Sequence, residues 1–221
     1  MGVLAQAWDW LADGANWAGE SGVRHRLGEH AYVSGVALAL ACAVALPVGL
    51  WLGHLGKGGG LAVNISNIGR AVPVFAVLAL FMVSPLRSAG YVPTIVALVL
   101  FAVPPLLTNA YVGMREVDRS VVEAARGMGM SGGQLLWRVE LPLARPLVMT
   151  GLRSAAVQVI ATATIAAMVG QGGLGRIITA GFNTYNTPQV VAGALLVAAL
   201  ALLVEGALVL LDRLLPGSAA R

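Results

Sequence analysis

Apolar residues dominate five long stretches of the chain, and shorter polar segments separate them. The stretches cover residues 31–53, 61–83, 91–113, 145–169 and 189–211. An α-helix needs about 20 residues to cross the hydrocarbon core of a bilayer. The pattern therefore predicts an all-α, polytopic membrane protein with about five transmembrane helices. The second stretch is the weakest, because Arg70 and other polar residues lie in its first turns and only residues 71–83 are fully apolar.

The two ends of the chain lie outside these stretches. Residues 1–30 are amphipathic and contain Trp8, Trp10 and Trp17, and tryptophan favours the headgroup level of a membrane. We expect an external, interfacial segment here, and an unstructured tail is the alternative. Several acidic residues and the lack of a continuous apolar core argue against a cleavable signal peptide. Residues 212–221 form a short polar tail.

The composition agrees with a membrane protein and excludes a water-soluble one. Of the 221 residues, 58% are apolar and 11% are charged, and the mean hydropathy is +0.82. Soluble domains have about 25% charged residues. The single cysteine, Cys42, cannot form an internal disulfide. His25, His30 and His54 lack the spacing of metal ligands, so we expect no metal site.

Lysine and arginine residues between the predicted helices fall unevenly on the two sides of the membrane. One side holds Lys57, Arg115, Arg119, Arg126, Arg138, Arg145, Arg213 and Arg221. The other side holds Arg24, Arg26, Arg87 and Arg176. Because cytoplasmic loops carry the excess of positive charge, we expect residues 114–144 and the C-terminus inside and the N-terminus outside.

The polar segment 114–144 has the pattern of two short helices joined by glycines. Ser120 and Glu123 stand three residues apart, as in a capping box, which predicts a helix over 121–128. Gly127 and Gly129 follow, and glycine readily takes the left-handed conformation that ends a helix.

A second capping-box pair, Ser131 and Gln134, predicts another helix to about Val139, with Pro142 just beyond its end. The segment mixes apolar and charged side chains. This suits either a knob that docks into a cytoplasmic partner or a structured loop packed on its own bundle. A DNA-reading helix–turn–helix is disfavoured, because two spans hold the segment and its net charge is near zero, so we expect no nucleic-acid partner.

The same segment resembles the EAA signature of the permease subunits of binding-protein-dependent ABC importers. Glu123-Ala124-Ala125 is followed by three residues, Gly129, nine residues and Val139-Glu140-Leu141-Pro142. Only Val139 departs from the usual isoleucine. The resemblance implies a MetI-like fold in which these coupling helices dock into a groove of an ATPase. Together with the amphipathic pattern, it predicts the ATPase-coupling residues Glu123, Ala124, Ala125, Gly129, Leu135, Leu136, Trp137, Leu141 and Pro142.

Residues 30–210 are similar to the osmoprotectant branch of that family, which imports glycine betaine, carnitine, choline or proline betaine. The similarity is carried by residues 69–73, 103–109, 123–129 and 170–175. It implies a second permease subunit (identical or homologous), cytoplasmic ATPase subunits that hold ATP and Mg, and an extracytoplasmic solute-binding protein. The expected location is a bacterial plasma membrane.

Nucleotide chemistry is not expected on this chain. A Walker A motif is absent, since Gly58 follows Lys57 where serine or threonine is required. The spacing of Gly170, Gly172 and Gly175 matches a dinucleotide fingerprint, but these residues follow an apolar helix and not a strand. We therefore expect no catalysis and no cofactor. A flexible loop near an outer gate is the preferred interpretation for Gly170, Gly172, Gly173 and Gly175.

Polar residues recur at every fourth position of the fourth stretch. Thr150, Ser154, Gln158 and Thr162 share one helix face, which either lines the solute path or joins two helices. Glu205 is an acid inside the fifth stretch, and pairing with a basic residue near the inner surface is its favoured role.

These patterns predict a transport subunit that is not itself an enzyme. An ABC permease for another amino-acid-like solute is one alternative. A second is a secondary transporter driven by an ion gradient, for which Glu205 is the only candidate acid. A third is a membrane scaffold without a transport role.

Overall fold

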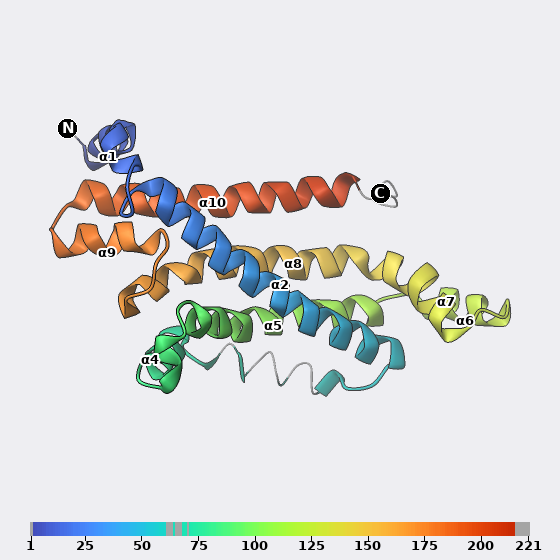
Figure 1. Cartoon of the computed structure of the whole chain (residues 1–221). Coiled ribbons are helices and arrows are strands. Elements are labelled where there is room, and N and C mark those ends of the chain that lie inside the picture. Colours follow the sequence, from blue (N-terminus) through green and yellow to red (C-terminus); the bar gives the residue numbers. More distant parts are fainter. Residues whose placement is uncertain (1, 61–63, 65–67, 70, 215–221) are drawn as a thin grey trace. The chain divides into compact units, whose positions relative to one another are not determined.

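The computed structural model describes residues 2–60, 64, 68, 69 and 71–214, and every regular element in these residues is a helix (Figure 1). The predicted all-α class is confirmed. In the predicted second span, residues 61–63, 65–67 and 70 lie outside the described residues. Residues 215–221 of the predicted tail also lie outside them.

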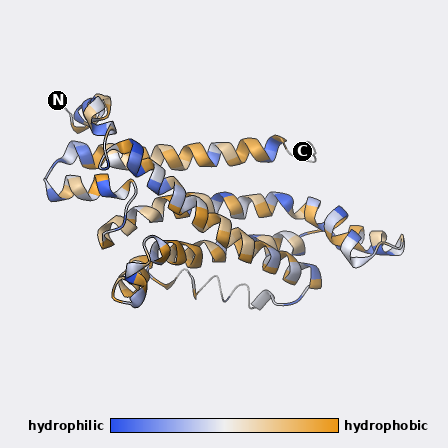
Figure 2. Cartoon of the chain, in the orientation of Figure 1, coloured by the Kyte–Doolittle hydropathy of each residue, from blue (hydrophilic) through white to orange (hydrophobic). Residues whose placement is uncertain are grey.

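Four helices in the described part of the chain are long and apolar enough to cross a membrane. They are α2 (Val23–Leu55), α5 (Val92–Arg115), the helix Gly132–Val169, which includes α8 (Leu141–Ala163), and α10 (Thr187–Leu214). Figure 2 shows apolar residues along most of α10. These helices match the first, third, fourth and fifth predicted stretches. In the second stretch the structure describes α4 (Val74–Met82).

The chain divides into two compact units. Unit 1 contains residues 1–38, 72–99 and 156–205, and unit 2 contains residues 39–71, 100–155 and 206–221. The division falls inside α2, α5, α8 and α10, so each of these helices contributes residues to both units.

The N-terminal residues of unit 1 are folded and packed. The helix α1 (Val3–Ala12) is followed by a 3-10 helix at Gly14–Trp17. Trp10 and Trp17 pack against a buried cluster formed by Val23, Ile160, Leu174, Ile177 and Val197. The Trp17 indole donates a hydrogen bond to the Leu11 carbonyl at 2.7 Å. The alternative of an unstructured tail is therefore wrong.

Unit 1 also contains a helix that the sequence patterns missed. No helix is predicted between the stretches 145–169 and 189–211, but α9 occupies Gly175–Asn183. A Cβ on Gly181 would lie 2.7 Å from Val190, and one on Gly193 would lie 2.8 Å from Ile178. These two glycines therefore let α9 pack closely beside the first turns of α10 (Figure 1).

In unit 2, small residues bring α2 and α8 close to α5. A Cβ on Gly49 would lie 2.8 Å from the Leu107 carbonyl oxygen, and one on Gly53 would lie 2.4 Å from the Met114 side chain. On α8, a Cβ on Gly151 would lie 2.6 Å from Asn109. Glycine lets helix backbones approach closely. Such packing stabilises helix pairs in a membrane, because lipid supplies no hydrophobic driving force for helices to associate.

Candidate functional site

The helix α6 (Arg119–Gly127) begins two residues earlier than the capping-box pattern predicts. Asp118 is its N-cap, and one carboxylate oxygen accepts hydrogen bonds from the Ser120 amide at 2.8 Å and the Ser120 hydroxyl at 2.9 Å. These bonds hold the pKa of the Asp118 carboxyl below its usual range. The prediction of Ser120 as the cap was wrong, because Asp118 caps the helix two positions earlier and the Ser120 amide is one of the free amides that it satisfies.

A glycine turn joins α6 to α7 (Gly132–Leu135), as predicted. Gly129 has φ +82° and its amide bonds to the Arg126 carbonyl at 2.9 Å, while the Met130 amide bonds to the Ala125 carbonyl at 3.2 Å. This pair of bonds is a Schellman motif. The predicted second box is also confirmed, since Ser131 and Gln134 cap each other reciprocally.

The second short helix does not stop before Pro142, and this prediction was wrong. A π-helical turn at Leu136–Glu140 leads directly into α8, and the Leu141 amide bonds to the carbonyl of Leu136, five residues back. Proline lacks an amide proton, and its ring collides with the carbonyl four residues before it. Widening the helix by one residue ahead of Pro142 avoids this collision and keeps the chain helical.

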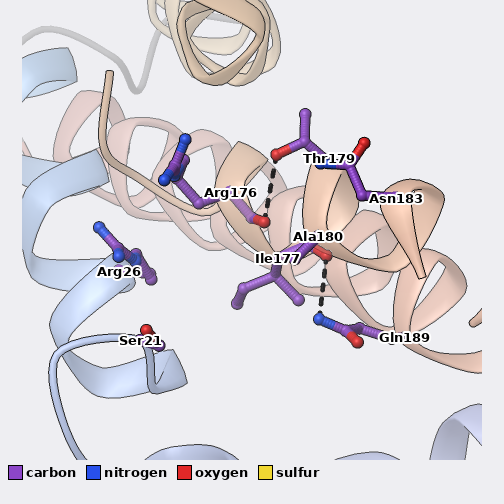
Figure 3. A pocket seen from close by; sticks show the side chains of 8 residues that line it. All are labelled: Ser21, Arg26, Arg176, Ile177, Thr179, Ala180, Asn183 and Gln189. Carbon is purple, nitrogen blue, oxygen red and sulfur yellow. Dashed lines mark hydrogen bonds between the residues drawn. The ribbon is translucent and has the colours of Figure 1, made fainter. Parts of the chain in front are cut away.

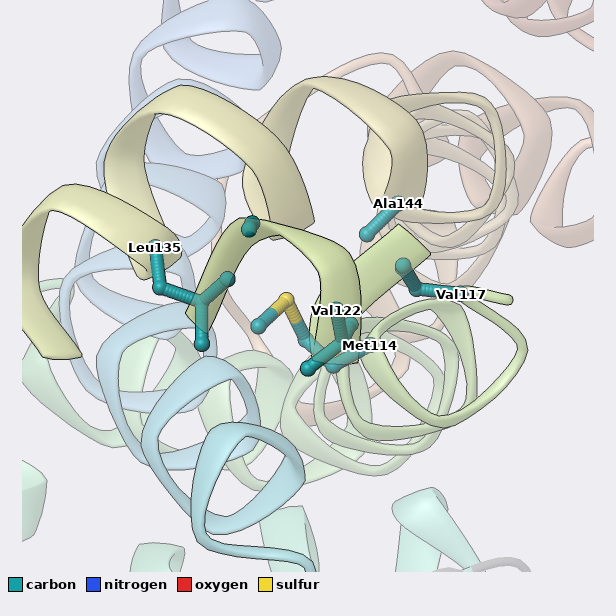
Figure 4. Close-up of a cluster of buried hydrophobic side chains, with 6 residues drawn as sticks. Met114, Val117, Val122, Leu135 and Ala144 are labelled. Carbon is teal, nitrogen blue, oxygen red and sulfur yellow. The ribbon is translucent and has the colours of Figure 1, made fainter. Parts of the chain in front are cut away.

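An apolar cluster lies beneath α6 and α7 (Figure 4). Its buried members are Met114, Val117, Val122, Ala125, Leu135 and Ala144. Leu136 is partly buried against it. The side chains of Ala125 and Leu135 are therefore inside the chain, and their predicted part in ATPase coupling stays a prediction.

The remaining predicted coupling residues are accessible to different degrees. Glu123, Ala124 and Pro142 are exposed, Leu141 is half-buried, and the Trp137 side chain has 66% of its surface exposed. The amphipathic pattern fixed which helix faces are apolar. It did not say whether this chain or a partner covers each apolar side chain.

A buried hydrogen-bonded pair in unit 2, Glu140 with His54, was missed. Glu140 has 1% of its surface exposed, and its carboxylate forms a hydrogen bond with Nδ1 of His54, near the end of α2. The two residues are 86 positions apart. No local pattern could have paired them, although Glu140 stands inside the signature and His54 ends an apolar stretch.

In unit 1, the loop before α9 is attached to Glu29 of α2. The Glu29 carboxylate accepts hydrogen bonds from the Gly173 amide at 2.9 Å, Arg26 Nη1 at 2.8 Å and the Tyr91 hydroxyl at 2.6 Å. Its side chain is 13% exposed. A Cβ on Gly172 would lie 2.5 Å from both carboxylate oxygens, so a larger residue here would displace the Glu29 carboxylate.

His30 holds the next residue of the same loop. Its Nδ1 accepts a hydrogen bond from the Leu174 amide at 3.3 Å, and its Nε2 lies 3.0 Å from the Ile160 carbonyl oxygen. Nδ1 can accept only when unprotonated, so Nε2 carries the hydrogen and donates it to Ile160. We call Glu29 and His30 the clasp. Gly175 is the first residue of α9 and not part of the loop, and the predicted gate role of the loop stays a prediction.

A polar cavity of about 190 Å³ lies beside the clasp in unit 1 (Figure 3). Its walls come from the turn before α2, from α2, from α9 and from the start of α10. The lining residues are Ser21, Arg26, Arg176, Ile177, Thr179, Ala180, Asn183 and Gln189.

The polar face of α8 is exposed at one end and covered at the other. Thr150 and Ser154 are exposed, Gln158 is half-buried and Thr162 is buried. The Thr150 hydroxyl donates to the Pro146 carbonyl at 2.9 Å. The choice between a solute path and helix packing therefore stays open for this face.

Comparison with known proteins identifies the family. Residues 45–215 match the family described as binding-protein-dependent transport system inner membrane component. The chain is 38% identical over 189 residues to the glycine betaine/carnitine/choline transport system permease protein OpuCB of Bacillus subtilis (strain 168), covering 86% of each chain. It is 39% identical over 193 residues to the carnitine transport permease protein OpuCB of Listeria monocytogenes, covering 87% of this chain and 88% of that one.

The fold has a solved counterpart. A chain of the MetNI methionine ABC transporter, crystallised in inward-facing conformations, superposes with a TM-score of 0.75 at 24% identity, over 86% of this chain and 94% of that one. The predicted MetI-like fold is confirmed. Together, the family match, the apolar helices and the two relatives lead to one conclusion: this chain belongs to the binding-protein-dependent transport system inner membrane components and is a multi-pass membrane permease subunit of the ABC importer class.

Proposed function

We propose that this permease carries a small zwitterionic or quaternary-ammonium osmoprotectant, such as glycine betaine, carnitine, choline or proline betaine. The relatives named for glycine betaine, carnitine and choline transport support this assignment, because they match most of the chain at 38% and 39% identity. A permease for a related amino-acid-like solute is the alternative. ATP and Mg bind the partner ATPase subunits in this proposal, and this chain supplies only the path.

The α6–α7 pair is the proposed ATPase-docking element, and one observation carries this assignment. Glu123 and Trp137 are exposed, while Val122 and Leu135 lie in the buried cluster beneath them. A solvent-facing tryptophan on a firmly packed support is typical of an interface anchor. The excess of basic residues on this side supports a cytoplasmic location, with the N-terminus outside.

A second permease subunit completes the path in this proposal. Thr150 and Ser154 are exposed on a membrane-spanning helix, where the Thr150 hydroxyl is bonded within its own helix, and a stripe of polar side chains is typical of a face that meets protein or water. The exposed polar face of α8 is therefore the proposed contribution of this chain to the path or to the subunit interface.

The docking assignment is tested by reversing one charge. Glu123→Lys should lower ATP-driven uptake in proteoliposomes at least about tenfold, because it places a cation in an interface that accommodates a carboxylate. Glu116→Lys is the matched control, since Glu116 is exposed just before α6 and should retain uptake. Wild-type uptake that persists without ATP would instead favour an ion-driven transporter, and equal uptake by both variants would contradict the docking role.

A further inference from the structure

The cavity in unit 1 is a charged and polar site that none of the assigned roles uses. Arg26 and Arg176 are its only charged lining residues, and among the described residues that line it none is acidic. Figure 3 shows the two arginine side chains on the same side of the cavity, one carried by α2 and the other by α9. Hydroxyl and amide side chains make up most of the remaining wall: Ser21, Thr179, Asn183 and Gln189.

The two arginines differ in how firmly they are held. Arg26 gives Nη1 to the Glu29 carboxylate at 2.8 Å, and its side chain is 16% exposed. This contact fixes the direction of the guanidinium and leaves its other N–H groups as donors. Arg176 is exposed in the first turn of α9. The cavity therefore combines one pre-positioned guanidinium with one that is accessible from solvent.

This chemistry selects a carboxylate and rejects a quaternary ammonium group. Guanidinium groups bind carboxylates through charge-assisted, often bidentate hydrogen bonds. Quaternary ammonium groups are recognised by aromatic faces, and no aromatic side chain lines this cavity. Sites for whole small molecules are mostly apolar and occupy about 300–1,000 Å³. A polar cavity of about 190 Å³ fits the end of one side chain better than a complete solute.

We propose that this cavity receives an aspartate or glutamate side chain of the extracytoplasmic protein that delivers the solute. The proposal rests on the proposed function and on the outward orientation of α9. The partner carboxylate would bridge Arg176 and Arg26, and through Arg26 it would touch the same Glu29 carboxylate that holds the Gly173 amide. Docking of the partner is thus linked by one hydrogen-bonded chain to the loop before α9.

The test measures binding of the system's own extracytoplasmic binding protein to the assembled transporter in lipid nanodiscs, both solute-free and loaded with carnitine. Arg176→Gln should weaken binding of both forms about threefold to tenfold, as the loss of one charge-assisted pair at an accessible interface implies. It should also flatten the dependence of binding on salt concentration. Arg24→Gln is the matched control, because Arg24 is exposed on α2, the helix that carries Arg26, and does not line the cavity.

The outcomes separate the possible sources of the carboxylate. Weakening confined to the carnitine-loaded form would mean that the solute supplies the carboxylate, which would overturn the proposed partner contact. Equal affinities for Arg176→Gln and wild type, or equal losses for Arg24→Gln, would overturn the site itself. Co-purification of the ATPase subunit with each variant verifies folding. If the proposed function itself were wrong, the wild-type transporter would show no ATP-driven uptake.

Discussion

A buried carboxylate is costly unless a partner satisfies it, and Glu140 has His54 as its hydrogen-bond partner. The pair joins the last turn of α2 to the π-turn that leads into α8. Removing one member of such a pair costs more than replacing both, because the survivor is left buried and unpaired. At the scale of single residues, this one contact connects the proposed docking element, α6 and α7 with the π-turn after them, to α2 within unit 2.

We predict that His54→Ala lowers the free energy of unfolding of the detergent-solubilised complex by about 3 kcal/mol. Glu140→Gln should cost less, since the amide oxygen can still accept from the imidazole. In a double-mutant cycle measured by thermal unfolding, the double variant should lose less free energy of unfolding than the two single variants lose together. Glu116→Gln, at an exposed position, should behave as wild type. Strict additivity would show that the pair does not interact.

The clasp binds backbone amides of the loop before α9, so amide hydrogen exchange can measure its effect. Glu29→Gln removes the charge and one acceptor oxygen from a site where the Gly173 amide, Arg26 and Tyr91 all donate. A hydrogen bond to a charged group contributes about 1.5–3 kcal/mol. We therefore predict that hydrogen exchange of residues 171–175 accelerates about tenfold or more. Glu20→Gln, at an exposed position nearby, should leave that exchange rate unchanged.

At the scale of elements, the α6–α7 turn depends on one glycine and not on its neighbour. Gly129 has φ +82°, whereas Gly127 is the last residue of α6 and has no positive φ. Gly129→Ala should cost about 1 kcal/mol of turn stability and weaken binding of the ATPase subunit. Gly127→Ala should be neutral or slightly stabilising, because alanine is the better helix residue. Thermal unfolding and ATPase co-purification measure both effects.

Sequence patterns predicted the elements best where the signal is local. The Ser131–Gln134 box and the Gly129 turn need only a few consecutive residues, and both are confirmed. The end of the second short helix was misplaced because proline was interpreted as a stop, while the π-turn accommodates Pro142. The helix α9 was missed because its glycine-rich sequence has low helix propensity, and packing against α10 stabilises it.

At the scale of the whole molecule, composition and the length of apolar stretches decide most of the architecture. They predicted the all-α membrane class and the four long helices of the described residues, because a bilayer imposes a length and a hydropathy on each span. They could not reveal contacts between distant residues, such as Glu29 with Gly173 or Glu140 with His54. Such contacts depend on which helices become neighbours, and a single sequence does not encode this in any local pattern.

The orientation of the chain gives a prediction for intact cells. In a background with Cys42→Ala, Thr184→Cys should react with a membrane-impermeant maleimide added outside, whereas Met128→Cys should react only after the cells are opened. Both positions are exposed, so accessibility across the membrane is the variable that differs. The positive-inside rule supplies the expected direction. Labelling of Met128→Cys in intact cells would reverse the proposed topology.

The π-turn before Pro142 also sets how α8 is rotated about its axis relative to α7. Adding or removing one residue in a helix turns everything on one side of the change by about 100° about the axis. The extra residue accommodated at Leu136–Glu140 therefore sets the angle about the helix axis between the face of α7 that buries Leu135 and the faces of α8. A single-residue deletion there would leave the composition and the apolar pattern of the span almost unaltered. It would nevertheless rotate the proposed docking face relative to α8, so a single-residue deletion here should weaken ATPase co-purification.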